Sequence, residues 1–89
     1  MTKRGKLEIM RDILEVIQKN KNFIKPTPLL RRSNLSSIRF KEYYSDLLER
    51  ELIKEIKDKE NKNITLTEKG FKFLERYKSI INFIDEFDL

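Results

Sequence analysis

Residues 27–51 of this 89-residue chain read TPLLRRSNLSSIRFKEYYSDLLERE, and they predict two helices separated by a sharp break. In the first helix, Thr27 is a candidate N-cap because its hydroxyl can accept a free N–H of the first turn. Pro28 suits the first helical position, where its missing N–H would have no partner in any case. The helix is expected to run from Pro28 to about Arg32, with its two leucines facing inward.

The break that follows, Ser33–Ser36, ends in a candidate cap for a longer helix. This helix is expected to begin at Ser36 and to run to about Glu51. Its apolar side chains recur at three- and four-residue steps, so they share one face while polar side chains occupy the other. The apolar face consists of Phe40, Tyr43, Tyr44, Leu47 and Leu48.

A helix is also expected upstream, over Lys6–Asn20, because apolar residues recur there at helical spacing. Phe23–Lys25 is too short for a helix, and the residue before Pro26 prefers an extended backbone. We interpret it as a one-bridge strand or a linker. The inward face of the upstream helix is expected to carry Leu7, Met10, Ile13, Leu14 and Ile17.

Downstream, Leu52–Lys57 and Asn63–Thr67 alternate apolar and polar residues, which is typical of half-buried strands. The polar stretch Asp58–Lys62 between them contains turn-forming Asp and Asn, so the pair predicts a two-stranded hairpin. Thr67 is the candidate cap of a last helix over Glu68–Phe87. The covered face of the hairpin is expected to carry Ile56, Ile64 and Leu66.

The order helix, short strand, helix, turn, helix, hairpin, helix is that of a winged helix-turn-helix, a mainly α fold with a small β-hairpin wing. We expect residues 1–67 to form this DNA-binding unit and residues 68–89 to form a dimerisation helix continuous with it. In the motif the second helix, here Ser36–Glu51, is the recognition helix that enters the major groove of DNA.

The chain has a formal net charge of +5, and this charge is unevenly distributed. Val16–Lys41 carries seven basic residues and no acidic one, whereas Ile80–Leu89 carries three acidic residues and no basic one. A basic block attracts polyanions, and phosphate contacts supply most of the non-specific affinity for nucleic acids. Charge alone leaves an ordinary lysine-rich surface open, but the asymmetry favours a nucleic acid as partner.

The candidate DNA contacts lie on the two helices of the motif and on the hairpin. An arginine early in the recognition helix can bind a guanine edge, a lysine can meet phosphate, and short serines can approach either. Lysines around the hairpin tip can reach the backbone or an adjacent minor groove. The complete set is Arg31, Arg32, Ser36, Ser37, Arg39, Lys41, Lys57, Lys59 and Lys62.

Some residues of the recognition helix also have a purely structural interpretation. Ser36 can be a helix cap without any contact to DNA. Tyr44 is more readily a core residue than a platform for base stacking, and Tyr43 leaves both open. Ile38 faces away from Phe40, so it either packs under the first helix of the motif or contacts a thymine methyl group; the sequence leaves both open.

The last helix carries a stripe that is typical of a coiled-coil seam, with spacings of four, three, four and three residues. A second stripe, Gly70, Leu74 and Ile81, can serve the domain's own core. Large apolar side chains beyond the first turns would stand in water in a monomer, so we expect a homodimer. The alternative is a helix that bends back over its own domain. The seam consists of Phe73, Tyr77, Ile80, Ile84 and Phe87.

Four stretches resemble those of small archaeal winged-helix DNA-binding proteins: KLEIMRDIL at residues 6–14, SNLS at 33–36, YYSDLLERELI at 43–53 and LTEKG at 66–70. The last stretch fits the LTxKG signature of a wider group of archaeal winged-helix regulators. The resemblance implies duplex DNA binding, sequence-tolerant or at an operator, by a homodimer whose C-terminal helices pair as an antiparallel coiled coil. Members extend further after LTxKG than this chain does, which bears on the length of that coiled coil.

Other classes of function lack the residues that they need. The chain has no cysteine and no histidine, so the usual zinc ligands and the commonest catalytic groups are missing. Asp85, Glu86 and Asp88 could hold a hard cation for a hydrolase, but a solvated helix end is the simpler interpretation. No apolar run of about 18 residues and no signal-peptide core is present. We therefore expect a non-enzymatic cytoplasmic, nucleoid-associated protein without a cofactor, metal, membrane or small-molecule ligand.

Two hypotheses remain for the function. One is a double-stranded DNA-binding protein, either a transcription regulator or a chromatin protein, and the sequence does not separate these two. The other is a winged-helix module that binds another protein without contacting DNA. Steep salt dependence of binding would favour the first, because phosphate contacts release counterions.

Overall fold

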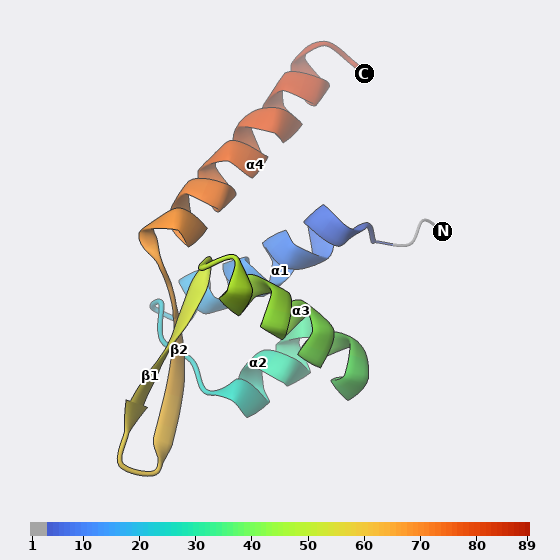
Figure 1. Ribbon diagram of the computed structural model, residues 1–89. Coiled ribbons are helices and arrows are strands. Elements are labelled where there is room, and N and C mark those ends of the chain that lie inside the picture. Colours follow the sequence, from blue (N-terminus) through green and yellow to red (C-terminus); the bar gives the residue numbers. More distant parts are fainter. Residues whose placement is uncertain (1–3) are drawn as a thin grey trace.

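The computed structural model describes residues 4–89, which form four helices and one antiparallel hairpin. Figure 1 shows α1, α2 and α3 packed together, with the hairpin beside them and the last helix leading away. This arrangement confirms the mainly α fold with a β-hairpin wing. The elements are α1 (Lys6–Lys19), α2 (Pro26–Ser33), α3 (Ser37–Glu49), β1 (Ile53–Asp58), β2 (Asn61–Leu66) and α4 (Glu68–Glu86).

The core lies between α1 and the elements around it. Leu7, expected to face inward, is instead exposed, and Ile9 is buried in its place. Leu7 lies in the first turn, where it borders an open groove beside Phe73 and Ile80 of α4. The buried core consists of Ile9, Met10, Ile13, Leu14, Ile17, Ile24, Leu29, Phe40, Leu47, Leu52, Ile53, Ile64 and Leu66.

Helix α2 begins earlier than expected. Pro26, not Pro28, occupies the first helical position, and Lys25 is the N-cap residue in place of Thr27. Lys25 has the extended backbone that a following proline imposes (φ −81°, ψ 156°). Its carbonyl oxygen accepts the N–H of Leu29 at 3.2 Å, which closes the first turn. A proline therefore occupies the first helical position as expected, but it is Pro26 rather than Pro28.

The turn between α2 and α3 relies on two short polar side chains. Asn34 ends α2 in the left-handed region (φ 59°, ψ 37°). Ser36 Oγ then accepts the N–H of Arg39 at 3.2 Å, so the predicted cap is confirmed. At its other end α3 stops at Glu49, because Glu51 has a positive φ of 60° that breaks the helix.

The hairpin is longer, and its turn tighter, than expected. Lys57 pairs directly with Lys62, and Asp58 with Asn61, so only residues 59–60 remain in the turn. Ile56, expected on the covered face, is 40% exposed because the outer half of the hairpin projects beyond the helices. Ile24 exchanges backbone hydrogen bonds with Ile64 (3.2 and 2.7 Å), which confirms the one-bridge strand before α2.

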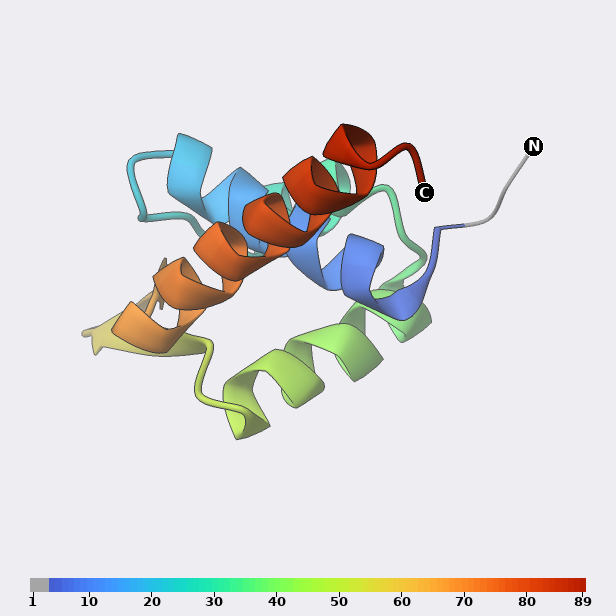
Figure 2. The ribbon, with the colours of Figure 1, turned by 90° about the horizontal axis from the view of Figure 1, so that it is seen from above.

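Helix α4 packs on the domain only over its first turns. Thr67 Oγ1 accepts the N–H of Gly70 at 3.0 Å, which confirms the predicted cap. Figure 2 shows α4 crossing over α1, and farther along Ile80 and Phe87 are 56% and 58% exposed. The helix therefore does not bend back over its own domain. The radius of gyration, 13.8 Å, accordingly exceeds the roughly 12 Å of a compact chain of this length.

Candidate nucleic-acid interface

The first half of α3 presents a ridge of side chains to solvent. Ile38, Glu42 and Ser45 are all exposed, and a helix with 3.6 residues per turn places them on the side opposite Phe40 and Leu47. Because Phe40 and Leu47 are buried in the core, this ridge is the outermost part of the helix. It is the part of α3 that would enter a groove first.

Basic side chains flank the ridge on both sides. Arg39 lines a shallow groove with Lys6 of α1, and its guanidinium lies 5.9 Å from the ring centre of Tyr43. Lys41 lies on the other flank. It precedes by one turn Tyr44, whose hydroxyl donates a hydrogen bond to Glu55 of the hairpin. In a DNA groove the base edges form the floor and a phosphate backbone runs along each side. A ridge of uncharged and acidic side chains with one cation on each flank is complementary to that arrangement.

The remaining candidate DNA contacts on the helix-turn-helix differ in their exposure and in the hydrogen bonds that they already form within the protein. Arg31 is exposed at the C-terminal turn of α2. Arg32 is also exposed, but its Nη1 donates to Asn20 Oδ1 at 3.0 Å. Ser36 serves as a cap, whereas Ser37 is exposed at the start of α3.

The two tyrosines of α3 pack against the core, so neither is a free stacking platform. The Tyr44 ring stacks on Phe40 at 5.6 Å, and its hydroxyl donates to Glu55 of β1. Burial and this hydrogen bond raise the pKa of the Tyr44 phenol. Sequence reasoning missed this contact, because the two residues meet only once the hairpin folds against α3.

The wing carries exposed cations at its outer end. Lys57 and Lys59 are exposed, and Lys57 lies directly opposite Lys62. Lys62 Nζ lies 3.3 Å from Glu55 Oε2. The hydrogen bond from Tyr44, and then the contact with Lys62, hold the pKa of Glu55 below its usual value. Of the lysines and arginines in the candidate set, Lys62 alone forms an ion pair within residues 4–89.

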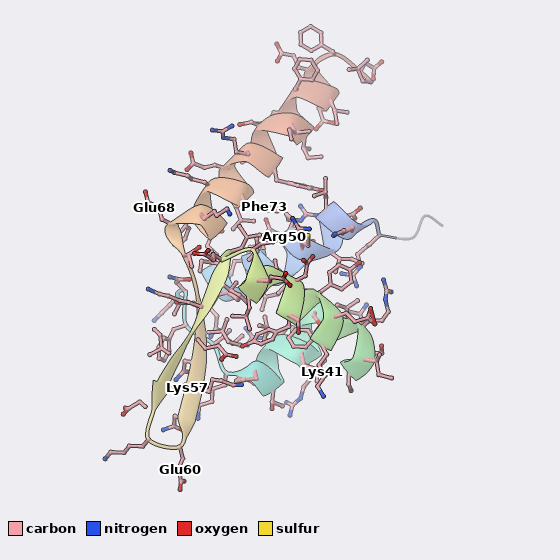
Figure 3. The ribbon with its side chains drawn as sticks, in the orientation of Figure 1. Lys41, Arg50, Lys57, Glu60, Glu68 and Phe73 are labelled. Atoms are coloured by element: carbon pink, nitrogen blue, oxygen red, sulfur yellow. The ribbon has the colours of Figure 1, made fainter. Side chains whose placement is uncertain are left out.

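The candidate residues of α3 and the wing lie at the same end of the molecule. Figure 3 shows Lys41 on α3 and Lys57 and Glu60 on the hairpin, on the side away from Glu68 and Phe73 of α4. Within the described residues, no acidic group of three or more is arranged to hold a metal ion. No helix of residues 4–89 is long and apolar enough to cross a membrane.

A sequence model of the protein family described as winged helix-turn-helix matches residues 3–85 of this chain. The chain therefore belongs to the winged helix-turn-helix family. It is similar in structure to Sso10a-2, described as a DNA-binding protein from Sulfolobus solfataricus, with a TM-score of 0.75 and 20% identity over 94% of this chain and 85% of that one. It is also similar to F-93 of SSV1, with a TM-score of 0.63 and 22% identity over 88% of this chain and 91% of that one. No curated protein matches the sequence significantly.

Proposed function

We propose that the protein binds double-stranded DNA, with α3 in the major groove and the wing on the adjacent backbone or minor groove. The observation that carries this proposal is the exposed start of α3, where Arg39 and Lys41 flank a ridge that no other element of residues 4–89 covers. Membership of the winged helix-turn-helix family and the fold shared with a DNA-binding protein support it. A protein of this function would be found on the nucleoid.

The wing supports the proposal through its own electrostatics. Lys57 and Lys62 are cross-strand partners, and like charges directly opposite each other destabilise a hairpin. Glu55 pairs with Lys62 but leaves Lys57 and Lys59 without an ion-pair partner among residues 4–89. A phosphate backbone beside Lys57 and Lys62 would neutralise this repulsion, while the exposed Asp58 would lie on the opposite face of the hairpin.

We further propose that the protein acts as a homodimer through α4. Phe73, Tyr77 and Ile80 line an apolar groove with Leu7, and Lys69, Lys72 and Arg76 border it. A second α4 laid antiparallel would fill this groove. It would also place the acidic end, Asp85 to Asp88, near those basic residues. Ile84 and Phe87 continue the same stripe toward the C-terminal end.

Mobility shifts with random-sequence duplexes at several salt concentrations test the DNA-binding proposal. We expect the logarithm of affinity to fall linearly with the logarithm of salt concentration, by about 0.9 per phosphate contact. Arg31→Gln/Lys41→Gln should weaken binding and flatten this slope. Lys19→Gln/Lys78→Gln, which removes the same charge from exposed positions outside the candidate DNA contacts and outside the α4 groove, is the matched control and should change both much less.

Failure to bind any duplex at low salt would contradict the proposal and favour a module that binds proteins. An equal loss in the two double variants would show that the affinity follows net charge rather than this face. Footprinting then separates two kinds of DNA-binding protein. A single protected palindrome indicates a regulator, and diffuse protection indicates a chromatin protein.

A further inference from the structure

Ile38 is an apolar side chain that the fold leaves largely exposed to solvent. It is 75% exposed, more than any other large hydrophobic residue of the described chain except the terminal Leu89. Packing under α2, one of the two interpretations open from the sequence, is therefore excluded. Isolated exposed apolar residues are common on protein surfaces, so the position of Ile38, rather than its exposure alone, carries the argument.

That position is the second residue of α3, on the outermost ridge of the helix. In the docking geometry of helix-turn-helix proteins, the first residues of the recognition helix face the base edges. Half of the other exposed large apolar side chains lie on α4 or at its C-cap, namely Ile80, Ile81, Phe83 and Phe87. Ile38 thus stands apart from the proposed dimer seam and at the centre of the proposed DNA-facing surface.

We propose that Ile38 makes the protein selective for thymine, by packing against the C5-methyl group in the major groove. This inference rests on the proposed function and specifies what the site reads. The thymine methyl is the apolar group that base pairs display in the major groove, and it favours apolar contacts over polar ones. Arg39 and Lys41, on either flank of Ile38, would hold the backbone and so keep the ridge in register.

The chemistry of the ridge favours a base over a phosphate as the partner of Ile38. An isoleucine side chain gains nothing from a phosphate oxygen, whereas it removes apolar surface from water on contact with a methyl group. Glu42, one turn further along the same ridge, would repel phosphate and can accept a hydrogen bond from the amino group of cytosine. Both residues are therefore suited to base edges, which implies sequence preference rather than uniform binding.

Replacement of thymine by uracil tests the proposal directly, because uracil pairs identically but lacks the methyl group. Selection from random duplexes first identifies a preferred site, and each thymine in it is then replaced in turn. We expect wild-type affinity to fall about fourfold at one position, the equivalent of one buried methyl group. Ile38→Ala should bind the thymine site about as weakly as the wild type binds the uracil site, and should not distinguish the two.

Ile56→Ala, an exposed isoleucine on the wing, is the matched control and should keep the thymine-to-uracil ratio whatever its overall affinity. Circular dichroism would establish that Ile38→Ala is folded, as expected for an exposed position. The inference is overturned if duplexes are bound but every uracil replacement is neutral. It is equally overturned if Ile38→Ala keeps the full ratio, or if selection returns no site that contains thymine. Absence of binding to any duplex would instead contradict the proposed function.

Discussion

Gly70 shows how one residue connects α4 to the rest of the domain. A Cβ at this position would overlap the carbonyl oxygen of Leu52, which itself accepts the N–H of Thr67 at 3.1 Å. The obstacle is backbone rather than a flexible side chain, so it cannot move aside cheaply. The Thr and Gly of the LTEKG stretch therefore have distinct physical roles: the threonine caps α4, and the glycine lets the helix approach the start of β1.

Gly70→Ala is expected to lower the free energy of unfolding by about 1–3 kcal/mol, the usual cost of overpacking a tight contact. Urea denaturation followed by circular dichroism measures this change. Gly5→Ala is the matched control, since nothing lies within 4 Å of a Cβ added there. Gly5 is the N-cap residue of α1, so this substitution should cost a few tenths to about 1 kcal/mol through the poorer cap and nothing through a clash. A Gly70→Ala protein as stable as wild type would show that Leu52 moves freely.

At the scale of elements, a hydrogen bond and an ion pair connect the recognition helix to both strands of the wing through Tyr44, Glu55 and Lys62. Tyr44 of α3 donates to Glu55 of β1, and Glu55 pairs with Lys62 of β2. The contact is partly shielded from solvent, so a hydrogen bond to this carboxylate contributes more than one between neutral groups. It orients the wing relative to the helix that would enter the major groove.

Tyr44→Phe should lower stability at pH 7 by about 1–2 kcal/mol, because it removes a hydrogen bond to a charged group. The pKa of Glu55 is lowered in the folded state, so the contribution of this contact is present at neutral pH and is lost as the pH falls below about 4. The wild type and the variant should therefore converge in stability at acidic pH. Unfolding curves at several pH values measure this difference.

Tyr43→Phe is the control for this prediction, since the Tyr43 hydroxyl forms no hydrogen bond to residues 4–89. It should leave both the stability at pH 7 and its pH dependence close to those of the wild type. A constant difference between Tyr44→Phe and wild type at all pH values would assign the loss to packing rather than to Glu55.

The lysines of the wing permit a second prediction at this scale. Lys57→Gln/Lys59→Gln/Lys62→Gln should weaken DNA binding and reduce the salt slope by about one unit for each lost phosphate contact. The same variant removes the repulsion between Lys57 and Lys62 but also the ion pair between Lys62 and Glu55, so these opposite effects should leave the stability of the free hairpin nearly unchanged. An unchanged slope in a salt series would mean that the wing does not touch DNA.

At the scale of the whole molecule, the projecting half of α4 would expose several large apolar side chains to water if the protein were a monomer. Ile80, Phe83 and Phe87 are each more than half exposed, and the molecule measures 50 × 29 × 22 Å. Burying such side chains contributes about 1.5–3 kcal/mol each. A small domain gains most by covering them with a second copy, which is the basis of the proposed homodimer.

Sedimentation equilibrium at micromolar concentration is expected to give a mass of twice 10.8 kDa for the wild type. Ile80→Asp/Phe87→Asp should be monomeric, since it places charges in the proposed seam without altering the domain's own core. Ser79→Asp/Asn82→Asp adds the same charge to exposed positions of α4 outside the stripe and should remain dimeric. A wild-type mass of 10.8 kDa would contradict the dimer, and dissociation in both variants would contradict this seam.

Local sequence determined the order and type of the elements. Helical spacing in α1 and α3, the caps Ser36 and Thr67, and alternation in the hairpin act over a few residues, and each is visible without a fold. The basic block and the resemblance carried by LTEKG likewise follow from the sequence. These signals predicted the winged helix-turn-helix and the set of candidate DNA contacts.

Tertiary structure alone decided which apolar residues are covered and which cations are free. Leu7 and Ile56 have the spacing of buried residues, but the elements that would cover them lie elsewhere, and burial depends on neighbours distant in sequence. Tyr44, Glu55 and Lys62 meet only because the hairpin folds back on α3. Ile38 remained ambiguous for the same reason. Its spacing placed an apolar side chain on the polar face of the helix. Only the packing of α2 against α3 showed that this side chain is exposed on the outer ridge.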